Sequence, residues 1–201
     1  PLPMRTGRYG CAVAVVGDQI FVRGGLDSEG KKLSSVEAYN VCSRKWSRVP
    51  PMRTKRSNCA AAAVGDKVMV FGGFGGGHHL ASVEEYDVRS RTWTPLPSLK
   101  TERSGCAVAV VGIKVYVCGG EDKYGRNLSS VEEYDLRSRK WTFAPAMTTE
   151  RDGCAAAAIG DRIFVFGGAN DGFTILSSAE AYDVRSRTWT SIPSMDTGRF
   201  A

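Results

Sequence analysis

Arginine recurs at one position of a repeated sequence, three residues before a cysteine. The four arginines are Arg8, Arg56, Arg103 and Arg151, and Arg199 begins a fifth copy. A guanidinium is always charged and presents its N–H groups as a planar fork that binds a carboxylate or phosphate through two hydrogen bonds. These residues are therefore candidates for binding an anionic group.

Glutamate recurs with the same period, two residues before a tyrosine. The four residues are Glu37, Glu84, Glu132 and Glu180. Side chains two residues apart in a strand point to the same side, so each glutamate should share the buried side of its tyrosine. A buried carboxylate needs a partner, and the recurring arginine is the obvious one. The sequence leaves two roles open for each arginine, a structural ion pair or a ligand contact, and some arginines could have both.

The elements that position these residues belong to a repeat of 47 or 48 residues, measured between successive tryptophans. A fixed period of this size indicates one supersecondary unit that is stacked several times. Each copy has a double glycine, a tyrosine 13 or 14 residues later and a tryptophan seven residues further on. We interpret these as structural residues: Gly24, Gly25, Gly72, Gly73, Gly119, Gly120, Gly167, Gly168, Tyr39, Tyr86, Tyr134, Tyr182, Trp46, Trp93, Trp141 and Trp189.

Each copy predicts four short strands, of which the first resembles CAVAVV and the last starts at the tryptophan. Pairs such as Gly17-Asp18 predict tight hairpins between the first two strands. The first strands are apolar on both faces, which predicts burial on both faces between two similar sheets. Their small Ala, Cys and Val side chains predict that neighbouring sheets converge there, as in a radial stack, while Tyr and Trp fill the wider gaps.

One copy departs from the apolar pattern, because Arg23 occupies the position of Phe71, Cys118 and Phe166. A charge in this position indicates an end sheet whose face is imperfectly covered.

The double glycine, the tyrosine and the tryptophan resemble the kelch repeat, in four copies that cover essentially the whole chain, and the chain resembles the kelch domains of BTB-kelch type proteins. The resemblance implies an all-β fold, a kelch-type β-propeller of four four-stranded blades with the first strand innermost. We predict a single kelch-repeat domain over residues 1–201, with blades at about 3–49, 50–96, 97–144 and 145–192. Residues 193–201 repeat the opening of the chain and begin a further repeat. The four blades could form a complete small ring or an arc of a larger one, and an incomplete ring predicts self-association.

The connections that follow the double glycines vary while their surroundings repeat, which indicates a binding role. We predict that their aromatic and polar residues contact a protein partner: Phe74, His78, His79, Tyr124, Arg126, Asn127, Asn170 and Phe173. The kelch resemblance also implies that Arg8, Arg56, Arg103 and Arg151 can face the mouth of a central channel. It therefore implies an acidic peptide as the ligand.

A second group of cations precedes the tryptophans and should lie on the opposite face, mainly as solvated turns: Arg44, Lys45, Arg89, Arg91, Arg137, Arg139, Lys140, Arg185 and Arg187. Nucleic acid is not the expected partner, because these turns lack aromatic platforms. No apolar run approaches the roughly 20 residues of a membrane span, so no membrane partner is expected. Cys11, Cys59, Cys106 and Cys154 recur in register with the core, as small buried side chains do. Reduced thiols favour a cytoplasmic or nuclear location.

The net charge of +6 favours acidic partners. We expect no catalytic centre, metal or cofactor, because the two histidines are neighbours and no Ser-His-Asp or phosphate-loop pattern occurs. The predicted function is a protein–protein interaction module, and the resemblance implies a substrate receptor of a cullin-RING ubiquitin ligase. An actin-associated scaffold and a small-molecule lyase or sugar isomerase are the alternatives.

Overall fold

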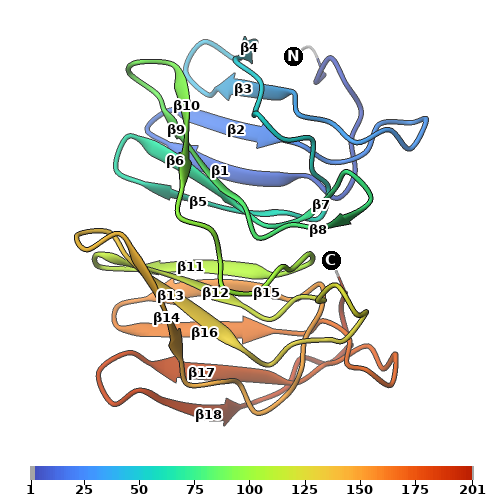
Figure 1. Cartoon of the computed structure of the whole chain (residues 1–201), viewed down its shortest axis with the longest axis vertical. Helices are drawn as coiled ribbons and strands as arrows, with labels where there is room; N and C mark the ends of the chain where they lie inside the picture. The colour runs from blue at the N-terminus through green and yellow to red at the C-terminus, as the bar shows by residue number, and fades with distance from the viewer. Residues whose placement is uncertain (1–2, 201) are drawn as a thin grey trace. The chain divides into compact units, whose positions relative to one another are not determined.

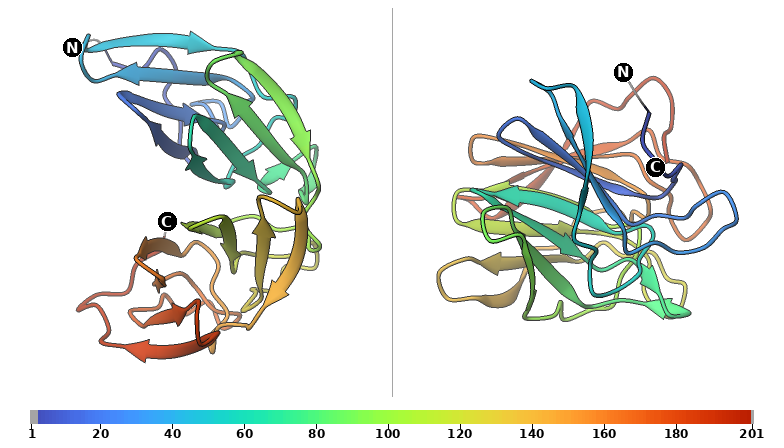
Figure 2. Two further views of the ribbon diagram at one scale, coloured as in Figure 1. Left: turned by 90° about the vertical axis from the view of Figure 1, so that its left-hand side faces the viewer. Right: turned by 90° about the horizontal axis from the view of Figure 1, so that it is seen from above.

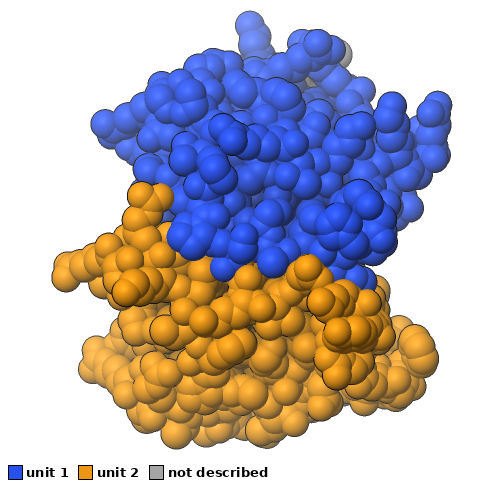
Figure 3. All heavy atoms as spheres, viewed as in Figure 1, with its two compact units in different colours: residues 1–98 blue, residues 99–201 orange. Residues whose placement is uncertain are grey.

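The computed structural model describes residues 3–200, which form antiparallel sheets (Figure 1). The chain divides into two compact units, residues 1–98 and 99–201 (Figure 3). We call each four-stranded sheet a blade and number the blades along the chain. The sequence predicted one domain, and the boundary between the two units falls between the second and third repeats. The described residues contain no helix long and apolar enough to cross a bilayer.

Unit 1 contains blades 1 and 2. Blade 1 has the strand order β1 (Ala12–Val16), β2 (Gln19–Arg23), β3 (Val36–Asn40) and β4 (Lys45–Val49). Blade 2 consists of β5 (Ala60–Val64), β6 (Lys67–Phe71), β9 (Val83–Asp87) and β10 (Thr92–Leu96) in the same spatial order. A small hairpin that the sequence did not predict follows β6 and pairs β7 (Phe74–Gly75) with β8 (His78–His79).

Unit 2 contains blades 3 and 4. Blade 3 has the order β11 (Ala107–Val111), β12 (Lys114–Cys118), β13 (Val131–Asp135) and β14 (Lys140–Ala144). Blade 4 has the order β15 (Ala155–Ile159), β16 (Arg162–Phe166), β17 (Ala179–Asp183) and β18 (Thr188–Ile192). The strands of each blade are tilted across one another in the views of Figure 2, as expected for twisted sheets.

Glycine fixes the turns at both ends of the first hairpin in each blade. In blade 1, Gly17 has a φ of 53° in the two-residue turn between β1 and β2, a backbone region that glycine occupies without steric cost. At the other end, Gly25 has a φ of 87°, and a Cβ there would lie 2.6 Å from the carbonyl oxygen of Tyr9. The double glycine is therefore required by both backbone conformation and close packing.

The core of unit 1 lies between the two blades. Ala12, Ala14 and Phe21 of blade 1 belong to one buried cluster with Val68 and Tyr86 of blade 2. We call this side of blade 1 its leading face and the opposing side of blade 2 its trailing face. The rings of Phe21 and Tyr86 are 5.9 Å apart, and Trp93 Nε1 donates to the carbonyl of Pro50 at 2.8 Å. Aromatic side chains thus join the two blades, as the sequence predicted.

Unit 2 repeats this packing with different residues. The leading face of blade 3, including Ala109 and Tyr116, packs against Ile163 and Tyr182 on the trailing face of blade 4. The two tyrosine rings are 5.9 Å apart, and Trp189 Nε1 donates to the carbonyl of Pro145 at 2.8 Å. The same blade-to-blade interface therefore occurs once in each unit.

The prediction that the first strands are buried on both faces is wrong for blades 1 and 4. Along β1, Ala12 and Ala14 are buried but Val13 and Val15 are exposed, and along β15 Ile159 is 71% exposed. Within unit 1, blade 1 meets blade 2 through its leading face only, and Val13 and Val15 point the other way. Small apolar side chains on both faces allow burial but do not require it.

The interpretation of Arg23 as a residue on an imperfectly covered face is also wrong. Arg23 has an exposed fraction of 0%, and burial lowers its pKa to about 10. Its Nη2 donates weakly to the carbonyl of Phe21 at 3.3 Å, while Nε and Nη1 have no partner among the described residues. Arg23 is thus a buried cation on the leading face of blade 1, beside Cys59, and no carboxylate among residues 3–200 pairs with it.

Candidate functional site

The recurring arginine and glutamate form a buried polar centre in every blade. In blade 2, Arg56 Nη2 donates to Glu84 Oε1 at 2.7 Å and to Ser82 Oγ at 3.0 Å. Nη1 of the same arginine donates to the carbonyls of Gly72 and Ser82 at 2.7 and 3.0 Å. Glu84 also accepts from the backbone N–H of Arg53 at 2.7 Å. These bonds offset the cost of burying both charges.

The other three blades repeat this arrangement. The ion pairs Arg8–Glu37, Arg103–Glu132 and Arg151–Glu180 have N–O distances of 2.9, 2.9 and 3.1 Å. All four arginine side chains have an exposed fraction of 0%. Of the two roles that the sequence left open, the structure shows the ion pair. The assignment of these arginines as ligand contacts is corrected, because each guanidinium is enclosed by groups of its own repeat and presents no surface.

Arg56 and Arg151 also link the two blades of their own unit through the short segment that precedes the first strand. We call residues 4–8, 52–56, 99–103, 147–151 and 195–199 the lead-in segments. The segment 52–56 is held to blade 1 by three backbone bonds: Met52 N to Ser34 O, Arg56 N to Leu33 O, and Gly25 N to Arg56 O, at 2.9, 3.1 and 2.9 Å. The Arg56 side chain then reaches into blade 2, so this one residue connects both sheets.

The loops after the double glycines of unit 2 lie side by side. Asp122 Oδ1 accepts from the N–H groups of Tyr124 and Arg126, which closes the first loop, and Asn170 Oδ1 closes the second in the same way. Asn127 joins them, since its N–H donates to Asp171 Oδ1 at 2.6 Å and its Nδ2 donates to the carbonyl of Ala169 at 3.2 Å. Both loops lie on the right-hand side of unit 2 in Figure 1.

Aromatic side chains project from these joined loops. Tyr124 is 70% exposed and Phe173 is 94% exposed. Lys123 and Arg126 lie 5.4 and 5.0 Å from the centre of the Tyr124 ring, within cation–π range. Arg126 also binds Asp122 at 2.7 Å; burial alone would raise the pKa of that carboxyl, but bonds from Arg126 and two backbone N–H groups hold it below its usual value. We call this region the unit 2 loop surface, formed by Lys123, Tyr124, Arg126, Asp171, Phe173 and Ile175.

The structure shows a positioning role for two predicted contact residues. Asn127 and Asn170 use the polar atoms described above to shape and join the loops, and their contact with a partner stays a prediction. Lys123, Asp171 and Ile175 of the same surface were not selected from the sequence. A shared pattern in these loops could have indicated their geometry. An Asp or Asn is followed three residues later by a residue with a left-handed backbone conformation, at Asp27, Asp122 and Asn170.

The corresponding loop of blade 2 has its own geometry. Phe74 and His79 pair across the β7–β8 hairpin, with ring centres 5.2 Å apart, while His78 is exposed. Lys32 of blade 1 lies 4.7 Å from the centre of the Phe74 ring. The structure therefore brings the predicted residues Phe74, His78 and His79 together in unit 1, and Lys32 is an additional member that the sequence did not reveal.

The cation-rich turns before the tryptophans are solvated turns, as the sequence predicted. In unit 2, Asp135 Oδ1 accepts from the N–H groups of Arg137 and Ser138, and Arg139 adopts a φ of 57°. These turns lie on the left of unit 2 in Figure 1, opposite the loop surface. Their side chains are largely exposed, and some form surface ion pairs, Arg185 with Asp161 and Arg187 with Glu133.

The described cysteines form no disulfide, and most of them are buried. Cys59, Cys106 and Cys154 are buried as predicted, whereas Cys11 is half-buried and Cys42 is exposed. Burial raises the pKa of the Cys154 thiol to about 12. Among residues 3–200, no three His, Cys, Asp or Glu side chains gather in a way that could hold a metal ion.

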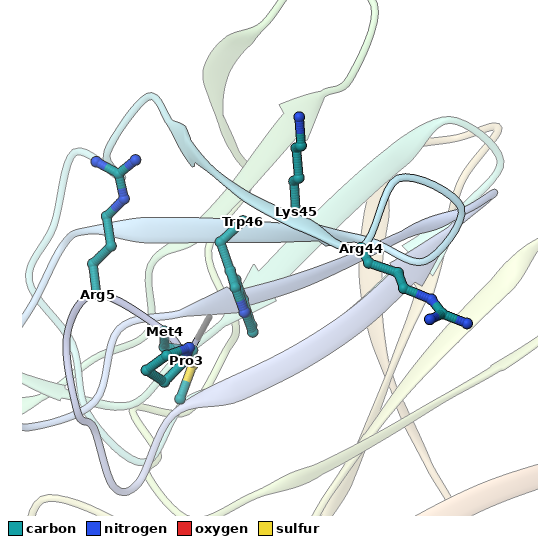
Figure 4. A pocket seen from close by; sticks show the side chains of 6 residues that line it. All are labelled: Pro3, Met4, Arg5, Arg44, Lys45 and Trp46. Atoms are coloured by element: carbon teal, nitrogen blue, oxygen red, sulfur yellow. The ribbon is translucent and has the colours of Figure 1, made fainter. Parts of the chain in front are cut away.

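A hollow of about 430 Å³ lies on the trailing face of blade 1, where Pro3, Met4 and Trp46 line it together with three cations. Figure 4 shows Trp46 pointing toward Pro3 and Met4, while Arg5, Arg44 and Lys45 point in different directions. Because the cations diverge, the hollow does not form a concentrated anion site. Trp46 is the aromatic residue of this hollow. In blade 2 the equivalent residue, Trp93, is covered by blade 1.

Comparison with known proteins identifies the repeat. Residues 3–168 match a family model described as the KLHDC2/KLHL20/DRC7 Kelch-repeats domain, and residues 150–196 match the Kelch motif. A solved structure titled "Structure of YjhT" superimposes with a TM-score of 0.86, covering 98% of this chain and 68% of that chain. Its identity of 15% shows the fold alone. No curated protein matches the chain.

The predicted fold class is confirmed: the chain is all-β and its four four-stranded blades are of the kelch-type β-propeller class. This fold suggests a protein-interaction module, since kelch propellers generally bind proteins. The family model covers most of the sequence, and the chain belongs to the KLHDC2/KLHL20/DRC7 Kelch-repeats domain family.

Proposed function

We propose that the chain is a protein-recognition module that binds an acidic protein segment on the unit 2 loop surface and acts without making or breaking bonds. The observation that carries this proposal is Phe173. It is an aromatic residue that is 94% exposed and held at a φ of 54°, where a side chain costs about 1–2 kcal/mol relative to glycine. The matching loop positions in blades 1 and 3 are Gly30 and Gly125, with φ values of 74°. A strained, exposed aromatic residue is typical of a contact site.

The surroundings of Phe173 support an acidic partner. Tyr124 provides a second exposed aromatic side chain on the joined loop, and Lys123 and Arg126 place positive charge beside its ring. Aromatic residues and arginine are enriched among the residues that dominate binding energy at interfaces. The hydrogen bonds through Asn127 hold both loops before a partner arrives, which reduces the ordering cost of binding.

The test selects twelve-residue peptides from a displayed library on the whole chain and measures their affinity by fluorescence anisotropy. We expect acidic peptides whose Kd rises more than tenfold in Tyr124→Ala and in Phe173→Gly. Phe173→Gly is well suited because it removes the ring and relaxes the backbone, so the fold is not weakened. Phe143→Ala, an exposed aromatic residue on β14, is the matched control and should leave affinity unchanged. Peptides that bind all three variants equally would refute the loop surface as the site.

Within this class we propose the role of substrate receptor for a cullin-RING ubiquitin ligase, which rests on the resemblance to BTB-kelch proteins. The gene product that contains this chain should shorten the half-life of a reporter carrying a selected peptide. An inhibitor of cullin neddylation should restore that half-life. An unchanged half-life contradicts the ligase role, and cosedimentation with actin filaments at physiological salt would support the scaffold alternative in its place.

A further inference from the structure

The connection after the double glycine of blade 2 differs in chemistry from the other three. Residues 74–79, Phe-Gly-Gly-Gly-His-His, contain no Asp or Glu, whereas the matching connections of the other blades each contain at least one carboxylate. In blades 1 and 3, Asp27 and Asp122 close the loop with their side chains. In blade 2 the strands β7 and β8 pair with each other and are joined by a turn at Gly76 and Gly77. The hairpin therefore has a defined shape without a negative charge of its own.

Two lysines of unit 1 adjoin this hairpin. Lys32, from the loop of blade 1, places its Nζ 4.7 Å from the centre of the Phe74 ring, within cation–π range. Lys55 belongs to the lead-in segment 52–56, and a Cβ at Gly75 would collide with its carbonyl oxygen, so only glycine lets the two backbones approach this closely. The blade 1 loop and the hairpin lie on the right-hand side of unit 1 in Figure 1. Elements of both blades of unit 1 thus meet at one place.

The cations at this place have no counter-ion among residues 3–200. No described carboxylate lies within ion-pair distance of three lysines, Lys31, Lys32 and Lys55. The unit 2 loop surface differs in this respect, because Arg126 binds Asp122 at 2.7 Å. Lys123 of the same surface lies 3.9 Å from Glu102. A group of unpaired cations favours a ligand that supplies the negative charge itself.

The turn of the hairpin adds two backbone donors. Gly76 and Gly77 are exposed, with φ values of 59° and 87°, and no described residue accepts from their N–H groups. The facing loop of blade 1 contains two carboxylates, of which Asp27 already accepts from the N–H groups of Glu29 and Lys31 at 3.0 and 2.9 Å. Free N–H groups beside cations are suited to an anion with several acceptor oxygens.

We propose that this region binds a phosphorylated segment of a partner protein through its phosphate group. We call it the unit 1 hairpin surface, formed by Lys31, Lys32, Lys55, Gly76, Gly77 and His78. A phosphate monoester carries a charge of about −1.5 to −2 at pH 7 and has three strong acceptor oxygens. It therefore matches several unpaired cations and two free N–H groups, whereas a single carboxylate supplies less charge and fewer oxygens. A protein is the source of the phosphate, because kelch propellers generally bind proteins.

The unit 1 hairpin surface is held in place before a ligand arrives. Phe74 and Ser57 exchange two backbone hydrogen bonds, at 3.0 and 2.8 Å, and Leu80 N donates to Gly73 O at 2.8 Å. The half-buried Phe74 ring in turn orients the ammonium group of Lys32. Prearranged donors reduce the ordering cost of binding. Phe74→Leu keeps an apolar side chain but removes the ring, so it should raise the Kd for a phosphorylated ligand about threefold.

The test selects twelve-residue peptides with a central phosphoserine on the whole chain and measures their Kd by fluorescence anisotropy. Removal of the phosphate by a phosphatase should raise Kd more than tenfold. The double variant Lys32→Gln, Lys55→Gln should also raise Kd more than tenfold. The matched control is Lys123→Gln, Lys140→Gln, which lowers the net charge by the same amount at two exposed lysines of unit 2 and should leave Kd unchanged.

Nitrogen–proton correlation spectra locate the phosphate directly. The amide signals of Gly76 and Gly77 should shift on addition of a selected phosphopeptide and should stay in place with its dephosphorylated form. Equal affinity for both forms of the peptide, or equal losses in the two double variants, overturns the proposal, since charge alone would then explain binding. Vesicles containing phosphatidylserine that bind more tightly than every selected phosphopeptide, and lose binding in Lys32→Gln, Lys55→Gln, would assign the surface to a membrane and overturn the protein partner.

Discussion

Two kinds of buried arginine occur in this protein, those paired with a carboxylate and Arg23, which has no such partner among the described residues. Arg103 is enclosed with Glu132, two carbonyl oxygens and a serine hydroxyl. Arg23 is equally buried but has one weak bond, to a carbonyl oxygen. A charge transferred from water without a partner is costly, and a carboxylate with several hydrogen bonds offsets that cost. The two residues therefore make contrasting substitutions informative.

Arg103→Ala should destabilise the chain by about 3–5 kcal/mol, because it leaves Glu132 buried without its counter-ion. Equilibrium unfolding in urea measures this loss. Arg137→Ala, in an exposed turn, should change the free energy of unfolding by less than about 0.5 kcal/mol. A loss of less than about 1 kcal/mol in Arg103→Ala would contradict a structural role for the ion pair.

Arg23→Met should have the opposite effect and stabilise the chain by about 1–4 kcal/mol. The substitution removes an unpaired buried charge and fills most of the same space with an unbranched apolar side chain. The other copies already have Phe or Cys at this position. Thermal unfolding followed by circular dichroism compares this variant with Arg56→Met, in which the lost guanidinium is paired. The melting temperature should rise in the first variant and fall in the second; a fall in both would show that Arg23 has a partner that compensates its burial.

At the level of the sheet, the tryptophan of each blade stabilises the fold to the extent that the preceding blade covers it. Trp93 is buried, packs against Tyr86 in a tilted arrangement with ring centres 5.1 Å apart, and donates to the carbonyl of Pro50, which follows β4 of blade 1. Trp46 packs against Tyr39 in the same tilted way, with ring centres 5.2 Å apart, but is only half-buried, on the trailing face of blade 1. The same residue in the same motif thus has two environments.

Trp93→Ala should therefore cost about 3–5 kcal/mol, as for a large core aromatic residue. Trp46→Ala should cost about 1–2 kcal/mol, because less apolar area leaves water when this side chain folds. Urea unfolding of the two variants under identical conditions gives the difference directly. Equal losses would mean that contact with the preceding blade contributes little, and that stacking on the tyrosine of the same blade accounts for the effect.

Elements fixed by local chemistry were predictable from the sequence, and contacts between distant loops were not. Glycine spacing and the Tyr–Trp interval sufficed for the strands, the hairpins and the repeat. The β7–β8 hairpin and the bond from Asn127 to Asp171 depend on residues that do not recur. The sequence could not decide between an ion pair and a ligand contact for Arg56. Period-two alternation predicts which side of a strand a side chain lies on, but it does not predict how far that side is exposed to solvent.

At the level of the whole molecule, repetition creates the same blade-to-blade interface once in each unit. Ala61 and Ala63 of blade 2 pack on blade 1, whereas Val13 and Val15 at the equivalent positions of blade 1 are exposed. In a stack of repeats, contact with the neighbouring repeat contributes much of the stability of each one. The burial of a recurring position therefore depends on whether a neighbouring blade covers it, and the residue type alone does not determine it.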